Sequence, residues 1–315
     1  MPMLRTLRLL NQLESNTITS TQLETLFTDA GRLADFVSLF QYTSTCNRLI
    51  TNPNACNIFR DSNKVMTALA GSSIAMPLLA GSSSTMTALA GSSSAMISLA
   101  RSSSAMTALA GNIIAGNAIR NSAATSKKAL LSNTPIGTYC PYFNGYYIVS
   151  LDLQNGTRSY YFLAPKSTET HIQYGYVGTD LALDNVGTPD YSNPGSTNNG
   201  NLSWDGNIIT KNYLAGTAGT AGYYVNSLIT NVGGFTTTAG TYFLPSLHEL
   251  VIILHHKDIF NAKVPSNETL TKGKYWSSTE YNIDHAWLVN FSNGAVAGNY
   301  KGDNNFVRGV SKIVV

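Results

Sequence analysis

A ten-residue repeat in the N-terminal third constrains the fold of this chain more than any other feature of its sequence. The segments MTALAGSSSA and MISLARSSSA follow one another, and a Met falls on every tenth position from 66 to 106, each followed three residues later by a Leu. The same register continues with other residues in the two positions, namely Phe36 and Leu39, Cys46 and Leu49, Cys56 and Phe59, and then, fading, Gly116 and Ile119. Residues 31–120 therefore share one design.

The length of the repeat argues against one continuous helix. Ten residues of a straight helix advance by about 1000°, so the Met and Leu stripe would slip by about 80° in every unit, and a coiled coil would need an irregularity in each. Each unit instead carries start and stop signals: Ser72 or Ser73 as N-cap, AMPLLA as the helix, and Gly81 as a left-handed residue after its end. We therefore expect one short helix per unit. Because no unit can bury its apolar face alone, the units must stack or oligomerise.

The repeat register also accounts for two of the three cysteines. Cys46 and Cys56 occupy the position that Met or Phe fills in other units, which predicts small buried apolar side chains rather than a disulfide or a metal site. Cys140 has no His or carboxylate cluster near it in the sequence, so we interpret it as structural. No cofactor and no metal are predicted.

Composition argues against several classes of function. Only 12% of the residues are charged and the net charge is +3, so neither nucleic acid nor an anionic membrane is an expected partner. No apolar run approaches the length of a membrane-spanning helix, and residues 1–20 lack the apolar core of a secretory signal. We expect no membrane insertion.

The sequence predicts four regions. Thr21 and Glu24 have the spacing of a capping box before a helix that ends near Gly31. Between residues 130 and 153, Ala, Ser and Met give way to alternating Tyr, Ile and Val, which is typical of strands. The predicted regions are a helical anchoring region at 1–30, a helical ten-residue-repeat stalk at 31–120, a linker at 121–136 and a globular head at 137–315.

Three segments of the head carry local signals. Residues 144–165 predict two strands joined at Asn155-Gly156. The AGTAGTAG run at 215–222 lacks the strand and helix context of a phosphate-binding loop, so we interpret it as a flexible approach to the helix YYVNSLI. Residues 244–260 predict a helix that starts with a Ser246–Glu249 capping box. Its expected apolar face is Leu247, Leu250, Val251 and Leu254, and its expected surface histidines, which lack a zinc-motif spacing, are His248, His255 and His256.

A second hairpin is predicted near the C-terminus. Trp287, Val289 and Phe291 alternate along a strand, and a two-residue Asn293-Gly294 turn would pair Phe291 with Val296, so these four would form one buried face. The opposite face would display Leu288, Asn290, Ala295, Ala297 and Asn299 to solvent. Exposed aromatic residues in the flanking loops 281–285 and 300–306 favour a binding surface. An ordinary solvated hairpin is the alternative.

Two motifs carry a resemblance to a known family. YFLPSLHEL, followed by YWSSTEYNIDHAWLVNFSNGAVAGNYKGDNNFVRGV, resembles the DUF1566 (Lcl C-terminal) family of C-type-lectin-like domains, and in particular the variable proteins of diversity-generating retroelements, many of them phage tail adhesins. Phe243 stands where the first motif usually has Arg. The resemblance covers about 137–315 and implies a C-type-lectin-like α+β head that displays variable residues. The expected fold class is therefore α+β.

The resemblance also implies a set of ligand-binding residues. Such retroelements substitute adenines, so their AAY codons can reach only a limited set of amino acids. The residues of this region that the set excludes fall on the framework or between variable positions, namely Trp276, Glu280, Trp287 and Lys301. We expect a framework ion pair between Glu280 and Arg308, and ligand anchors at Tyr281, His285, Tyr300 and Phe306. The predicted ligand-binding residues are Tyr281, Asn282, Ile283, Asp284, His285, Leu288, Asn290, Ala295, Ala297, Asn299, Tyr300, Asp303, Asn304, Asn305 and Phe306.

The expected function is host-receptor binding without catalysis. The resemblance implies a phage tail-fibre or receptor-binding protein in the virion tail, made in the host cytoplasm, which binds a glycan or protein receptor and attaches to other virion tail proteins through its N-terminal region. We expect a homo-oligomer, by analogy a trimer. The alternatives are a bacterial cell-surface adhesin and a glycan-processing enzyme, which would need a pair of carboxylates in a cleft. Related formylglycine-generating enzymes need cysteines in the head, and none follows Cys140.

Overall fold

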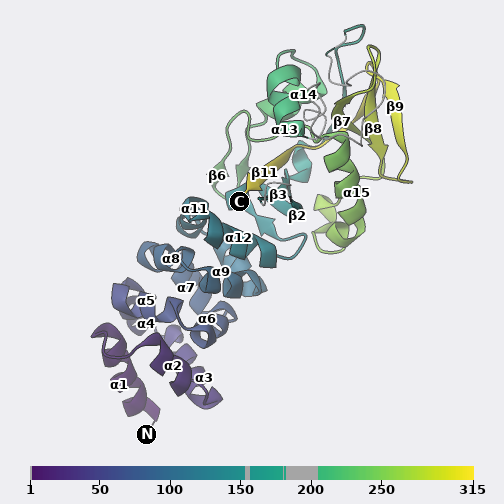
Figure 1. The fold of residues 1–315 in the computed structure, drawn as a ribbon. Coiled ribbons are helices and arrows are strands. Elements are labelled where there is room, and N and C mark those ends of the chain that lie inside the picture. The colour runs from purple at the N-terminus through teal and green to yellow at the C-terminus, as the bar shows by residue number, and fades with distance from the viewer. Residues whose placement is uncertain (1, 153–156, 180, 182–204) are drawn as a thin grey trace. The chain divides into compact units, whose positions relative to one another are not determined.

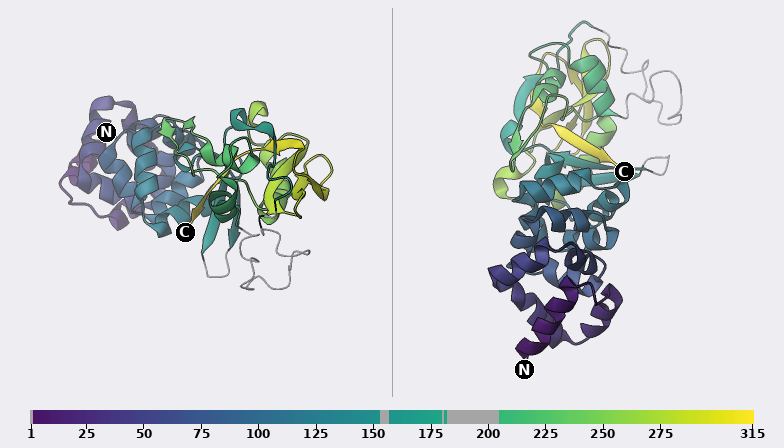
Figure 2. Two further views of the ribbon diagram at one scale, coloured as in Figure 1. Left: turned by 90° about the horizontal axis from the view of Figure 1, so that it is seen from above. Right: turned by 90° about the vertical axis from the view of Figure 1, so that its left-hand side faces the viewer.

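The computed structural model describes residues 2–152, 157–179, 181 and 205–315, and it combines helices with sheets (Figures 1 and 2). The α+β prediction is therefore confirmed. The chain forms two compact units. The N-terminal unit is Met1–Pro135 with Tyr139–Tyr142 and Val315, and the C-terminal unit is Ile136–Thr138 with Phe143–Val314.

The N-terminal unit is built from short helices, one for each ten-residue repeat (Figure 1). This confirms the prediction of separate helices over a continuous one. In chain order the unit contains α1 (Pro2–Glu14), α2 (Ser20–Leu26), α3 (Ala30–Ser38), α4 (Thr43–Thr51), α5 (Pro53–Arg60), α6 (Asn63–Ala70), α7 (Ala75–Ala80), α8 (Ser83–Ala90), α9 (Ser93–Ala100), α10 (Ser103–Ala110), α11 (Ile113–Asn121), α12 (Ala124–Asn133) and the two-residue strand β1 (Tyr139–Cys140).

The repeat helices stack as a superhelix with three helices in each turn. From α4 to α9, each helix packs against the next helix and against the helix three units later, as α5 does on α8 and α6 on α9. Figure 2 shows the short helices in successive layers. The repeats therefore bury their apolar faces within one chain. Burial alone does not require oligomerisation.

The five units from α6 to α10 share the same four buried positions. In α6 these are Val65, Met66, Leu69 and Ala70, and the spacing i, i+1, i+4, i+5 places them on one helix face. Cys46 and Cys56 occupy the Met position of their own units, are completely buried, and are free thiols, which confirms the register extended from the sequence. The register weakens at its start, where Phe40 is buried in place of the half-buried Leu39.

In two units the repeated serine links successive turns of the superhelix. The hydroxyl of Ser82 accepts a hydrogen bond from the backbone N–H of Thr85 and donates one, at 3.0 Å, to the carbonyl of Ile50 at the end of α4. Ser102 does the same for Ala105 and Ala70. One small hydroxyl thus satisfies both a free donor at a helix start and a free acceptor at a helix end. In the unit of α7 the Ser72 hydroxyl accepts from the backbone N–H of Ala75, but the residue before the helix is Ile74, so the expected serine N-cap at 72 or 73 is not found there.

The predicted role of glycine at the helix ends is wrong. Gly81 has φ −77°, which is right-handed backbone, and Arg101 holds the same place in its unit with φ −79°. The helix ends because the following residue, Ser82, is extended and already caps the next helix. No left-handed residue is needed at this position.

Two predictions for the flanks of the repeat are also corrected. The capping box of α2 uses Thr19 and Gln22 rather than Thr21 and Glu24, and the helix ends at Leu26 instead of reaching Gly31. Glu24 instead accepts hydrogen bonds from the Ser62 hydroxyl and the Lys64 backbone N–H at the start of α6. Residues 121–136 are not a plain linker, because α12 packs on α9 as the last helix of the superhelix.

The C-terminal unit contains three sheets and three α-helices (Figure 1), counted over the described residues. The predicted hairpin at 144–165 is confirmed as β2 and β3, although Asn155-Gly156 lies outside the described residues. The first sheet includes β2 (Gly145–Asp152), β3 (Arg158–Leu163) and β11 (Val310–Val314). The second has the order β4 (Thr170–Gln173), β10 (Asn304–Val307), β7 (Lys274–Glu280), β8 (His285–Asn290) and β9 (Val296–Tyr300), and the third pairs β5 (Asn231–Val232) with β6 (Phe235–Thr236). The helices are α13 (Gly206–Ile209), α14 (Ala221–Ser227) and α15 (Leu247–Asn261).

Two apolar cores lie on opposite faces of the second sheet. The first core lies where α15 and the first sheet meet β7 and β8, and it includes Ile253, Val289 and Phe291. The second core contains Trp276, Leu288 and residues of α13 and α14. The Ser246–Glu249 capping box of α15 is confirmed. Its buried face differs in part from the prediction, because Ile253 is buried while Val251 and Leu254 are only half-buried.

Candidate functional site

The C-terminal hairpin has a longer turn than the sequence predicts. Val289 pairs with Val296, and Asn290 donates a hydrogen bond to the carbonyl of Ala295 at 2.8 Å, so residues 291–294 form a four-residue loop. Gly294 takes up the left-handed backbone of this loop, with φ +79°. Phe291 is completely buried in the first core and does not pair with Val296.

The predicted division of the hairpin into a buried face and a displayed face is wrong. Leu288, expected on the displayed face, is only 2% exposed and lies in the second core, whereas Val296, expected to be buried, is 44% exposed. β8 is an inner strand with a core on each face, and β9 is the edge strand beyond it (Figure 1). The unbroken apolar run at 286–289 is the signal that could have shown this, because strands covered on both faces lack alternation.

Two exposed and two half-buried rings nevertheless gather at this hairpin. Tyr281 packs edge-on against Trp287 with ring centroids 4.7 Å apart, and it also approaches His285 at 6.3 Å. The His285 ring in turn lies 6.2 Å from that of Tyr300, its partner across the strands. Tyr281 and Tyr300 are 44% and 45% exposed. We call these four residues, together with the exposed Val296, the aromatic surface.

Two glycines allow the tyrosine rings to approach the backbone closely. A side-chain carbon added at Gly298 would stand 3.0 Å from the ring of Tyr281, and one added at Gly302 would stand 2.6 Å from the ring of Tyr300. Both distances are shorter than an ordinary carbon contact. Neither glycine has a local sequence signal for this role, because only the fold shows which ring each one supports.

Phe306 is not part of the aromatic surface. It lies in β10, half-buried, with its ring stacked on Tyr275 at 5.3 Å and 3.7 Å from the ring of His171. Gly273 leaves room for this ring as well. The predicted anchor in an exposed loop is therefore a packed residue of the second sheet. Its neighbour Asn305 is buried too.

The other predicted ligand residues have at least partly exposed side chains, and some of them shape the turns. The Asn282 side-chain oxygen accepts hydrogen bonds from the backbone of Asp284 and His285, at 2.9 and 2.8 Å, and so closes the 281–285 loop. Asn299 donates to the carboxylate of Asp303 at 3.0 Å. The remaining members of the predicted set, all half-buried or exposed, are Ile283, Asn290, Ala295, Ala297 and Asn304.

The framework ion pairs differ from the prediction. Glu280 pairs with Lys301, and both side chains are completely buried. Arg308 pairs with Glu268 at 3.0 Å and donates to the carbonyl of Ala164 at 2.8 Å. The two partners of Glu280 and Arg308 come from distant parts of the chain, so sequence spacing could not reveal them.

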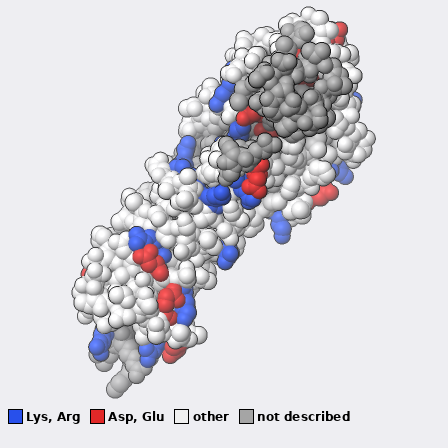
Figure 3. Space-filling model, in the orientation of Figure 1, with Lys and Arg blue, Asp and Glu red and all other residues white. Residues whose placement is uncertain are grey.

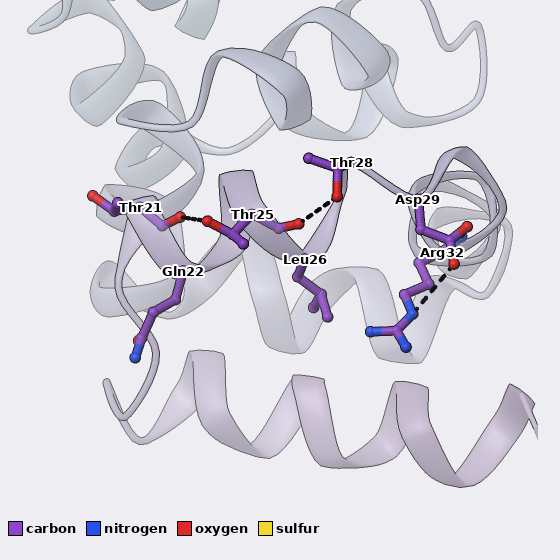
Figure 4. Close-up of a pocket in the computed structure, with 7 residues that line it drawn as sticks. All are labelled: Thr21, Gln22, Thr25, Leu26, Thr28, Asp29 and Arg32. Carbon is purple, nitrogen blue, oxygen red and sulfur yellow. Dashed lines mark hydrogen bonds and ion pairs between the residues drawn. The ribbon is translucent and has the colours of Figure 1, made fainter.

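Other candidate sites lack converging chemistry. Among the described residues no three His, Cys, Asp or Glu side chains lie close enough to hold a metal ion, and burial lowers the pKa of His248. A hollow of about 570 Å³ on α2 and the start of α3 is lined by residues that bond to one another, such as Thr25 to the carbonyl of Thr21 (Figure 4). Charged side chains are scattered over the face drawn in Figure 3. The aromatic surface is therefore the candidate site.

Comparisons with family models, with curated proteins and with solved structures gave no match. Within the described ranges, none of the helices is long and apolar enough to cross a bilayer.

Proposed function

We propose that the chain is a receptor-binding adhesin whose C-terminal unit, a C-type-lectin-like domain by the motifs at 242–250 and 275–308, binds its receptor on the aromatic surface. The observation that carries the proposal is the contiguous arrangement of Tyr281, His285 and Tyr300 on an edge hairpin backed by two cores. Such rings offer large apolar contact and polar tips at a small cost in side-chain entropy, which suits a recognition site.

The proposal extends to a phage tail-fibre protein in the virion tail. The superhelix would then act as a spacer, and the N-terminal helices would attach to other tail proteins. A homotrimer is also part of this proposal. Burial of the repeats does not require it, because the repeats bury their apolar faces within one chain. Its support is the avidity gained by linking several heads. A near-copy of the codons for 275–310 in the neighbouring DNA, beside a reverse transcriptase gene, would support the resemblance to retroelement variable proteins.

Cell binding by the full-length chain tests the proposed function. Fluorescently labelled protein is incubated with a panel of bacterial strains and bound label is measured by flow cytometry. We expect at least one strain to bind, and the double variant Tyr281→Ala/Tyr300→Ala to lose that binding while its melting temperature stays near that of the parent. Tyr223→Ala is the matched control, because Tyr223 in α14 is also exposed, at 38%, and lies outside the aromatic surface.

The same assay separates glycan from protein receptors. Periodate treatment of the cells would remove a glycan receptor, and protease treatment would remove a protein receptor. Binding that survives in the double variant, or that is lost equally in Tyr223→Ala, would refute the assignment of the aromatic surface. Absence of binding to any strain would refute the adhesin proposal for that panel.

A further inference from the structure

Lys301 is buried although it directly follows the edge strand β9. It follows the exposed Tyr300 directly, yet its side chain has no exposed area. Burial of a charged group is costly unless the group is paired and fully hydrogen-bonded. A buried lysine directly after an exposed residue therefore indicates a specific task.

Every polar group of Lys301 has a partner. Its ammonium group donates to the carboxylate of Glu280 and, at 2.9 Å each, to the carbonyls of Thr179 and Ile283. An ammonium group has three donors, and all three are used. Its backbone N–H donates to the carbonyl of Asp284 at 2.9 Å, and its carbonyl accepts from Gly175 at 3.1 Å.

These bonds join the segments that carry the aromatic surface. Tyr281 follows Glu280 in sequence and Tyr300 precedes Lys301, so each exposed tyrosine is the chain neighbour of one member of the buried pair. Ile283 and Asp284 belong to the loop that places His285. Gly175, Thr179 and Leu181 are tied to the same point, since the carboxylate of Glu280 also accepts from the Leu181 backbone at 3.0 Å.

We propose that the Glu280–Lys301 pair is the positioning element of the aromatic surface. It holds the loop 281–285 and the turn after β9 in one arrangement, so that exposed residues on them can change without loss of that arrangement. The pair touches no ligand itself. The inference rests on the proposed function for its meaning, but the arrangement can be measured on the protein alone.

The test uses the double variant Glu280→Gln/Lys301→Met in the full-length chain. Replacing both members avoids a lone buried charge, which Lys301→Met by itself would create, so the variant is expected to fold. Hydrogen exchange is followed at the amides of Gly175, Asp284 and Lys301, with amides of β2 and β3 as the internal reference. Lys274→Met is the control, because Lys274 is an exposed lysine at the start of β7.

We expect exchange at the three loop amides to rise by about tenfold or more in the double variant, with β2 and β3 unchanged. Nuclear Overhauser contacts between the rings of Tyr281 and Trp287 should weaken in parallel, and the control should match the parent in both measurements. Parent-like exchange in the loops would overturn the proposal, as would an equal rise in β2 and β3, which would show a purely structural role. Neither result depends on the receptor, so failure here leaves the cell-binding test intact.

Discussion

Replacing Leu288 by Ala separates a core role from a ligand role for this residue. Strand alternation places Leu288 on the displayed face of the hairpin, yet it is 2% exposed and packs in the second core. Truncation to Ala removes three carbons, worth about 0.8 kcal/mol each in lost burial, or about 2.4 kcal/mol together. The cavity left behind adds to this, so we expect the free energy of unfolding of the C-terminal unit to fall by about 2–5 kcal/mol.

Urea denaturation followed by Trp fluorescence measures this change in the C-terminal unit alone. All three Trp residues, at 204, 276 and 287, fall within the sequence of that unit. Val296→Ala is the matched control, since it also truncates an apolar hairpin residue but one that is 44% exposed, and we expect a loss below about 1 kcal/mol. Equal effects of the two substitutions, or a loss below about 0.5 kcal/mol for Leu288→Ala, would refute the assignment of Leu288 to the core.

Three further predictions test other parts of the fold. Cys46 should resist alkylation at pH 8 in the native protein and react once the protein is unfolded, because burial shields the thiol from the reagent and raises its pKa to about 11. Rapid labelling of native Cys46 would contradict the repeat register. Gly81→Ala should leave the stability of the N-terminal unit unchanged or raise it by up to about 1 kcal/mol, because the backbone there is right-handed and an added Cβ would stand 3.5 Å from its nearest neighbour. Thermal melts followed by circular dichroism measure this, and a loss of about 1 kcal/mol would restore the left-handed interpretation. Phe306→Ala should lower the free energy of unfolding of the C-terminal unit by more than about 1 kcal/mol, because its ring stacks on Tyr275; loss of cell binding at parent stability would instead return Phe306 to the ligand site.

The candidate site was only partly predictable from the sequence. Tyr281, His285 and Tyr300 were expected in exposed positions near a hairpin, and the structure places them together. The predicted exposure of Phe306 and Leu288 is wrong, because it depends on which strands flank β10 and β8. The role of Lys301 had no local signal at all, since its partners at Thr179, Ile283 and Glu280 are brought to it by the fold.

Sequence by itself determined the features that depend on neighbours within a few residues. The short helices of the repeat follow from a serine N-cap and an apolar spacing that both act inside ten residues, and the capping box at Ser246 and Glu249 starts α15 in the same way. Tertiary structure alone decided that three helices complete a turn, because that depends on packing between units thirty residues apart, three units of ten. It also decided the strand order β4-β10-β7-β8-β9, in which a strand late in the chain inserts between two earlier ones. Pairing between distant strands is selected by the burial of whole faces, and no local pattern encodes it.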